Sequence, residues 1–133
     1  MSVVVDTGAV LALMRADDDH HEEARNLFAT LDDDLVTSPL ALAELDHLVG
    51  ARGGRSASEA LWRDLERGAY TVRWWADALD ESLRIVRRHP SLGLTDASLV
   101  ALAGRLRTTR IATFDGHFRS IETPQGDPFT LLP

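Results

Sequence analysis

Four short, largely apolar runs, each separated from the next by enough chain for one or two helices, constrain the fold of this sequence most. They are Val3–Val5, Leu35–Thr37, Tyr70–Trp74 and Arg110–Phe114. The first run is β-branched and does not alternate with polar residues, as is typical of a strand covered on both faces. Helices between the strands predict crossover connections and therefore parallel pairing. We expect a three-layer α/β/α sandwich with a mainly parallel central sheet of four to five strands.

Helix boundaries are marked by capping residues, glycine and proline. Ser38-Pro39 is a helix-start signal, and Gly50–Gly54 is expected to break the helix that follows. Thr95 is expected to cap the last long helix, and Phe129–Leu132 to add a short final strand. The expected helices are Ala9–Met14, His20–Leu31, Pro39 to about Val49, Ser58–Arg67, Asp77–His89 and Thr95 to about Leu106.

Length and charge narrow the class of protein. The 133 residues fit a single domain, expected to span residues 1–133. The absence of cysteine excludes disulfides and Cys-ligated zinc and fits a cytoplasmic location. The early apolar stretches are too short for a membrane span and lack the basic start of a signal peptide, so we expect neither membrane association nor export. The net charge of −7 argues against a broad basic surface, so nucleic acid would need bound cations or a limited arginine patch.

Four acidic residues stand at strand ends or among apolar helix positions. Asp6 and Asp115 each follow a predicted strand, and the carboxyl ends of parallel strands are where ligand sites form in open α/β sheets. Glu44 shares a helical stripe with the apolar residues one turn before and after it, so we expect it to face the core. Asp96 stands on an equally apolar stripe in the first turn of its helix. These four residues are the candidate site.

Carboxylates gathered in a buried site need a compensating charge, because burying each one costs several kcal/mol. Arginines could neutralise them one by one, or a hard divalent cation could gather them, and Mg²⁺ or Mn²⁺ suits oxygen ligands. Plainer readings exist: a cap or turn for Asp6, a helix-dipole acid for Asp96 and a turn for Asp115-Gly116. Glu44 is hardest to explain in that way, and the four together favour a shared site.

Four segments spread over nearly the whole chain are similar to the motifs of one family. Val3–Leu11 resembles a first-strand motif in which an Asp is followed by Thr or Ser, and Ser38–Leu45 resembles the helix that supplies a Glu. Leu94–Ala103 resembles the helix that supplies a third acid, and Ile111–Phe118 resembles a closing Thr-any-Asp motif with a downstream Phe. In this order and spacing, the chain resembles the VapC-type toxins of the PIN-domain superfamily.

The resemblance implies a metal-dependent endoribonuclease that hydrolyses RNA with one or two Mg²⁺ or Mn²⁺ ions. Asp6 and Asp96 would be the central metal ligands, and Glu44 and Asp115 would complete the catalytic site directly or through water. The family also implies the toxin of a type II toxin–antitoxin pair. Its partners would be RNA, a cognate VapB-like antitoxin and a second copy of the chain in a homodimer.

Smaller features of the motifs bear on the same site. Thr7 or Thr113 could orient a carboxylate by a hydrogen bond. Gly8 stands where many family members carry Ser, which removes a hydroxyl but no expected ligand. No further acid follows closely after Asp96, which leaves the second metal position open.

Receiver, phosphatase and nucleotide-binding domains are alternatives to a nuclease for a parallel α/β fold. Response-regulator receivers and haloacid-dehalogenase-like phosphatases also place acids at strand ends, but both ordinarily need a lysine and this chain has none. A Walker-type nucleotide site is excluded because the chain has no Gly-Lys-Ser/Thr motif. A structure-specific or DNA-directed PIN-like nuclease and a non-catalytic PIN-like interaction module remain as alternatives.

Histidines, tryptophans and arginines outside the motifs each allow a functional and a purely structural interpretation. No histidine spacing matches a zinc motif, so solvated positions are expected for His20, His21 and His117. Trp74-Trp75 is expected in the core or an oligomer interface rather than stacked on RNA bases. Five arginines at or after the ends of the last two predicted helices could contact phosphates or simply be solvated. These arginines are Arg87, Arg88, Arg105, Arg107 and Arg110.

Overall fold

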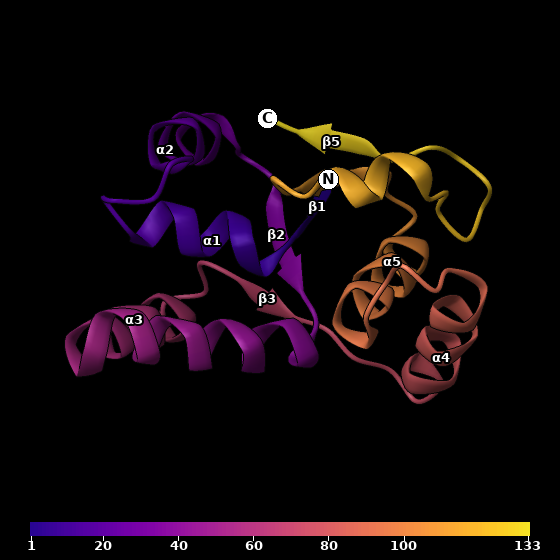
Figure 1. Cartoon of the computed structure of the whole chain (residues 1–133), viewed down its shortest axis with the longest axis horizontal. Helices are drawn as coiled ribbons and strands as arrows, with labels where there is room; N and C mark the ends of the chain where they lie inside the picture. The colour runs from indigo at the N-terminus through magenta and orange to yellow at the C-terminus, as the bar shows by residue number, and fades with distance from the viewer.

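The computed structural model describes residues 1–133 as an ordered alternation of strands and helices. Figure 1 shows the strands at the centre with helices to either side. The elements are β1 (Ser2–Val5), α1 (Thr7–Met14), α2 (His21–Thr30), β2 (Asp34–Thr37), α3 (Pro39–Glu66), β3 (Thr71–Val72), α4 (Ala78–Arg88), α5 (Leu94–Leu106), β4 (Arg110–Ala112), the 3-10 helix η1 (Gly116–Ser120) and β5 (Thr130–Leu132).

The sheet has five strands in the order β3-β2-β1-β4-β5, and every neighbouring pair is parallel. β1 is the central strand, with Val4 paired to Val36 of β2 on one side and to Ile111 of β4 on the other. The predicted parallel sheet is therefore confirmed. Because all strands run the same way, their carboxyl ends meet at one edge of the sheet.

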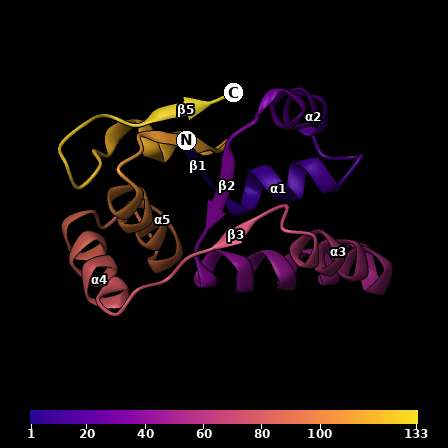
Figure 2. The ribbon, with the colours of Figure 1, turned by 180° about the vertical axis from the view of Figure 1, so that it is seen from behind.

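The three valines of β1 divide between two apolar layers. Val4 belongs to the core formed with α5, while Val3 and Val5 belong to the core formed with α1, α2 and α3. Both faces of the strand are thus covered, which explains the unbroken β-branched run. Figures 1 and 2 show α4 and α5 on one side of the sheet and α1, α2 and the far end of α3 on the other, as the predicted three-layer fold requires.

The predicted break at Gly50–Gly54 is found at its last residue. α3 spans Pro39–Glu66 as two helical parts that meet at a kink at Gly54, whose φ of 71° and ψ of −167° are not helical, so the first part runs past the expected end near Val49. Gly50 and Gly53 stay in the helix because buried side chains before and after them, including Val49 and Leu61, pack in the same core. That burial offsets the roughly 1 kcal/mol per residue that glycine costs in a helix.

Other boundaries differ by a few residues. The expected strand Tyr70–Trp74 shortens to β3, and the final strand begins at Thr130 rather than Phe129. Gly93, not Thr95, is the N-cap residue of α5, which begins two residues earlier than a cap at Thr95 would place it. Ser38 caps α3 as predicted, because its Oγ accepts a hydrogen bond of 3.1 Å from the amide of Ala41. No helix is both long enough and apolar enough to cross a bilayer.

Candidate active site

The four predicted acids line a single pocket of about 610 Å³ at the carboxyl edge of the sheet. Asp6 directly follows β1, and Asp115 follows β4, the strand paired with β1. Glu44 reaches the pocket from α3 and Asp96 from the first turn of α5. Residues far apart in the sequence therefore meet in one place.

Asp6 is the most enclosed of the four, with only 8% of its surface exposed. Its Oδ2 accepts a hydrogen bond of 2.8 Å from the hydroxyl of Thr113. The Oγ1 of Thr113 in turn accepts a hydrogen bond of 2.9 Å from the amide of Asp115. Thr113 therefore joins two of the acids and fixes the orientation of the Asp6 carboxylate.

Thr7 does not orient a carboxylate as Thr113 does. Its hydroxyl donates a hydrogen bond of 3.3 Å to the carbonyl of Ala41 on α3. This bond ties the start of α1 to the start of α3, which brings the backbone next to Asp6 close to the helix that carries Glu44. The predicted carboxylate-orienting hydrogen bond is found for Thr113 and not for Thr7.

Burial and mutual repulsion raise the pKa of two of these carboxyl groups. The pKa of Asp6 is raised from 3.8 to about 6, mainly by burial and then by the negative charges of Asp96 and Asp115, while the hydrogen bond from Thr113 lowers it. The pKa of Asp96 is also raised, first by burial and then by the charges of Asp115 and Glu44, while His117 opposes the shift. Positive charge placed in the pocket would favour the ionised form of both groups.

Glu44 does not face the core, which corrects the expectation from its helical stripe. The buried stripe of α3 consists of Ala41, Leu45 and Val49, each one turn from the next. Glu44 lies beside this stripe, is exposed and lines the pocket. An acid at the border of an apolar stripe keeps its carboxylate in water, so it needs no positive charge to compensate for burial.

Asp96 is half-buried because α5 packs closely against the start of α3. The hydroxyls of Ser38 and Ser98 lie 2.7 Å apart in a buried hydrogen bond between the two helices. This contact fixes the first turns of α3 and α5 next to each other. It brings Glu44 and Asp96 to the same pocket.

Asp115 combines the turn role and the pocket role that its sequence allowed. Its Oδ1 accepts a hydrogen bond of 2.9 Å from the amide of His117 and so caps η1. The Oδ2 lies 3.2 Å from the Nδ1 of the exposed His117 ring. The same carboxylate lines the pocket with the other three acids.

Comparison with known proteins identifies the family of the chain. The PIN domain family matches residues 3–123. The chain belongs to the PIN-domain family. Ribonuclease VapC26 of Mycobacterium tuberculosis is 36% identical over 135 residues, which cover 98% of this chain and 100% of that protein.

Two solved structures described as a toxin and as a toxin–antitoxin complex share this fold. The chain superposes on the crystal structure of M. tuberculosis VapC20, described as a Sarcin-Ricin loop cleaving toxin, with a TM-score of 0.80 and 26% identity over 86% of this chain and 91% of that one. A toxin–antitoxin complex from Klebsiella pneumoniae gives a TM-score of 0.71 over 90% and 92% of the two chains, and its 16% identity makes it a likeness of fold.

The donor set of this PIN domain suits a hydrated divalent cation. No three His, Asp or Glu side chains are placed to hold one metal ion among them, although four carboxylates line the pocket. Mg²⁺ usually binds through one or two carboxylates and keeps several waters, so a looser arrangement of oxygen donors is compatible with it. A cation bound there would favour the ionised form of the buried Asp6, whose pKa is raised by burial.

Arg52 is the site residue that sequence reasoning missed. It lines the acid pocket from α3, and it follows Glu44 and Leu48 at intervals of one helical turn. Because the helix was expected to end near Val49, Arg52 was assigned to a loop. In a helix that continues past Arg52, the spacing of eight residues, or about two turns, places Arg52 and Glu44 on the same face.

Two aromatic predictions have clear outcomes. His20 is exposed at the start of α2, as expected, but it also lines the pocket and stacks on Phe114 with ring centroids 4.4 Å apart. Trp75 packs against the core next to α5, whereas Trp74 is 41% exposed. Trp75 thus takes the expected core position, and Trp74 leaves an aromatic surface open beside β3.

Proposed function

We propose that this protein is a metal-dependent endoribonuclease that hydrolyses RNA phosphodiester bonds and acts as the toxin of a type II toxin–antitoxin pair. The observation that carries the proposal is the convergence of Asp6, Glu44, Asp96 and Asp115 on one pocket of a PIN fold. The names ribonuclease, for VapC26, and toxin, for VapC20, support the reaction and the biological role.

The cation is Mg²⁺ or Mn²⁺, held by Asp6 and Asp96, with Glu44 and Asp115 completing the set for one or two ions. When bound, the ion activates water and stabilises the charge that develops on phosphate oxygens. Asp6 is kept in place by the hydrogen bond from Thr113, so its ionised oxygen is oriented before any ligand arrives. Such supporting hydrogen bonds commonly contribute 10–100-fold to metal affinity or activity, roughly.

Arg52 positions the RNA. Among the residues that line the acid pocket, Arg52 is the one arginine. It forms no ion pair with any of the acids there. A free guanidinium group facing an otherwise acidic pocket attracts the phosphate backbone of a strand whose neighbouring phosphodiester lies at the carboxylates.

The partners are RNA, an antitoxin of the VapB type and a second copy of the chain. An antitoxin that blocks the acid pocket would hold the enzyme inactive in the cytoplasm. The exposed apolar side chains of Val72, Trp74 and Leu79 lie on β3, the loop after it and α4, and they support a homodimer contact there. Sedimentation of the Trp74→Ser variant tests this: a monomer is expected, and an unchanged dimer would exclude this surface.

The experiment that tests the function compares RNA and DNA pools incubated with purified protein and Mn²⁺. We expect cleavage of RNA, loss of cleavage on addition of EDTA, and loss of at least about a hundredfold in rate for Asp96→Asn. Asp32→Asn is the matched control, because Asp32 is an exposed loop acid that does not line the acid pocket. It should cleave like the wild type.

Two outcomes would replace the proposal by its alternatives. Cleavage of DNA alone would assign a DNA-directed PIN-like nuclease. Absence of cleavage of either polymer, together with growth inhibition that Asp96→Asn leaves unchanged, would assign a non-catalytic interaction module.

A further inference from the structure

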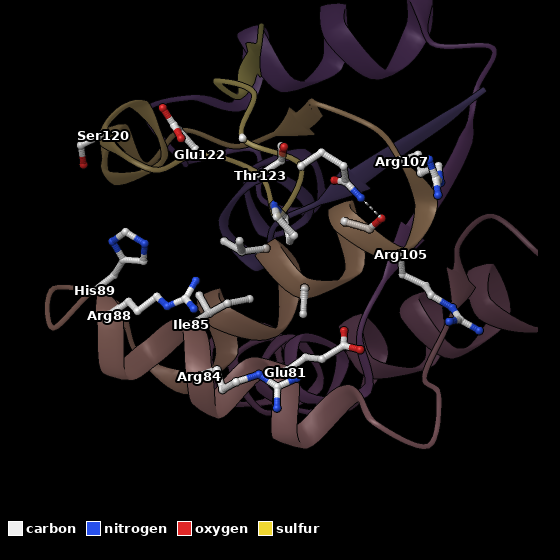
Figure 3. Close-up of a pocket in the computed structure, with 16 residues that line it drawn as sticks. Glu81, Arg84, Ile85, Arg88, His89, Arg105, Arg107, Ser120, Glu122 and Thr123 are labelled. Carbon is white, nitrogen blue, oxygen red and sulfur yellow. Dashed lines mark hydrogen bonds between the residues drawn. The ribbon is translucent and has the colours of Figure 1, made fainter.

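A second, larger cavity of about 850 Å³ lies between α4, the carboxyl-terminal half of α5 and the segment 120–126. Figure 3 shows Arg84 and Arg88 on α4 at one side of this groove, with Ser120 and Thr123 at the other. None of its lining residues lines the acid pocket. It is therefore a separate feature of the surface, and we name it the arginine groove.

The arginine groove gathers positive charge in a protein whose net charge is −7. The arginines that line it outnumber its acids, Glu81 and Glu122. No ion pair is formed by these arginines, whereas four arginines elsewhere in the chain pair with acids. The groove arginines are Arg84, Arg88, Arg105 and Arg107.

The walls of the groove are fixed by packing and hydrogen bonds. Gly104 on α5 lies directly against Pro124, because a Cβ at residue 104 would overlap the proline ring. The side-chain amide of Gln125 donates a hydrogen bond of 2.8 Å to the carbonyl of Gly104. The segment 120–126 is thus held against α5 and cannot easily fold over the groove. Arg84 and Arg88 lie one helical turn apart on the same face of α4.

The two arginines at the end of α5 are also held in place. The guanidinium carbon of Arg105 lies 5.6 Å from the centre of the Trp75 ring, in a cation–π contact. Arg107 adopts a left-handed backbone conformation with φ of 54°, which usually favours glycine or asparagine. Its amide contacts the carbonyls of Ala103 and Gly104 and closes the helix. The backbone at Arg107 is therefore fixed by the end of α5.

We propose that the arginine groove binds the phosphate backbone of RNA away from the scissile bond. This rests on the proposed function, because the RNA would be the substrate. Guanidinium groups bind phosphate oxygens with paired hydrogen bonds, and the hydroxyl of Thr123, which accepts a hydrogen bond from the amide of Asp127, keeps its hydrogen for a phosphate oxygen. Contacts of this kind supply affinity and position the strand without reading its sequence.

The lining favours RNA over an acidic segment of a partner protein. Protein interfaces depend on large apolar or aromatic anchors seated in well-packed pockets. The groove is lined by no Phe, Tyr or Trp, and Ile85, Val100 and Ala101 provide little apolar surface among its polar side chains. A phosphodiester backbone needs no apolar anchor, so it suits this groove better.

The position of the groove also fits an extended substrate. Asp96 stands in the first turn of α5, and Gly104 follows eight residues later on the same helix. At 1.5 Å per residue, the acid pocket and the groove are about 12 Å apart along the helix axis. A strand of a few nucleotides can bridge this distance, so one RNA could contact both places.

The test measures RNA binding separately from RNA cleavage. A fluorescein-labelled single-stranded RNA is titrated with full-length protein in EDTA, and fluorescence anisotropy is followed at several salt concentrations. The double variant Arg84→Gln/Arg88→Gln is compared with Arg25→Gln/Arg63→Gln, which removes the same charge from exposed positions on α2 and α3. Thermal unfolding of each variant checks that the fold is retained.

We expect the groove variant to bind RNA roughly tenfold more weakly than the control variant at low salt. The slope of log affinity against log salt should fall by about 1.4, since each phosphate contact to a single strand contributes about 0.7. In Mn²⁺, its KM for RNA should rise while kcat stays near the wild-type value. Equal binding by the two double variants would overturn the inference while leaving the nuclease proposal intact.

Two further outcomes separate the inference from the proposed function. If the wild type binds RNA through the groove but cleaves none, the inference about the groove is confirmed and the proposed nuclease function is wrong. If a labelled poly-glutamate peptide binds the wild type more tightly than RNA does, and the groove variant loses that binding, an acidic protein segment is the occupant and the RNA inference is wrong.

Discussion

Replacing Asp6 by Asn is expected to remove a pH-dependent loss of stability from the metal-free protein. Asp6 is 8% exposed, and its pKa is raised from 3.8 to about 6 in the folded chain. Between these two pH values the folded protein retains a proton that the unfolded chain has released. Stability therefore falls as pH rises through this window. The contribution is fully present below pH 4 and lost above about pH 6.

The size of the effect follows from the shift in pKa. A change from 3.8 to about 6 corresponds to about 3 kcal/mol of unfolding free energy, at roughly 1.36 kcal/mol for each factor of ten in proton affinity. Asn keeps the shape and can still accept the hydrogen bond from Thr113, but it carries no charge. The stability of Asp6→Asn relative to the wild type should therefore rise by about 3 kcal/mol from acid to neutral pH.

The assay is denaturant unfolding in EDTA, repeated from pH 4 to pH 8 for the wild type, Asp6→Asn and the exposed control Asp32→Asn. Contributions from unrelated groups cancel when the curves are subtracted. Asp32→Asn should show no such pH-dependent difference. A flat difference between Asp6→Asn and the wild type across this range would refute the reasoning, because it would mean that the Asp6 carboxylate is not held in an unfavourable environment.

Three other predictions follow from single contacts. Thr113→Val should lower the rate of RNA cleavage in Mn²⁺ by about 10–100-fold, because Asp6 loses its orienting hydrogen bond. Thr113→Ser should retain most of the rate. Equal rates for the two variants would show that the hydroxyl of Thr113 does not orient Asp6. Arg52→Gln should raise KM for RNA by about tenfold with little change in kcat. The control is Arg55→Gln, because Arg55 is already paired with Glu59. Identical KM values for the two variants would show that Arg52 does not contact the RNA. Gly104→Ala should lower the free energy of unfolding by about 1–3 kcal/mol because the added methyl group overlaps Pro124, and a variant as stable as the wild type in urea would contradict that packing.

The parallel sheet could be predicted because each of its features is local in the sequence. The β-branched run before Asp6 shows that both faces of β1 are covered, and Ser38-Pro39 marks the start of α3 through a cap and a fixed proline φ. Asp6 and Asp115 could be placed together because parallel neighbouring strands end at the same edge. The positions of these residues need no knowledge of distant contacts.

The errors arose where distant packing outweighs local preference. Glycine is a poor helix residue, yet α3 continues past Gly50 because Val49 and Leu61 are buried on either side. The orientation of Glu44 was misjudged because a stripe of apolar neighbours cannot tell a buried position from one at its border. Arg52 was missed as a consequence of the first error. The arginine groove depends on contacts between α4, α5 and the segment 120–126, which no local pattern encodes.

Binding of Mn²⁺ measured by titration calorimetry tests the central claim, that the separated carboxylates form one cation site. The wild type and Asp32→Asn should bind Mn²⁺ saturably and with equal affinity. Asp6→Asn and Asp96→Asn should each weaken binding by more than about tenfold, since each removes a charged oxygen donor from the same ion. Mn²⁺ binding that is absent in the wild type, or unchanged in both site variants, would contradict the account.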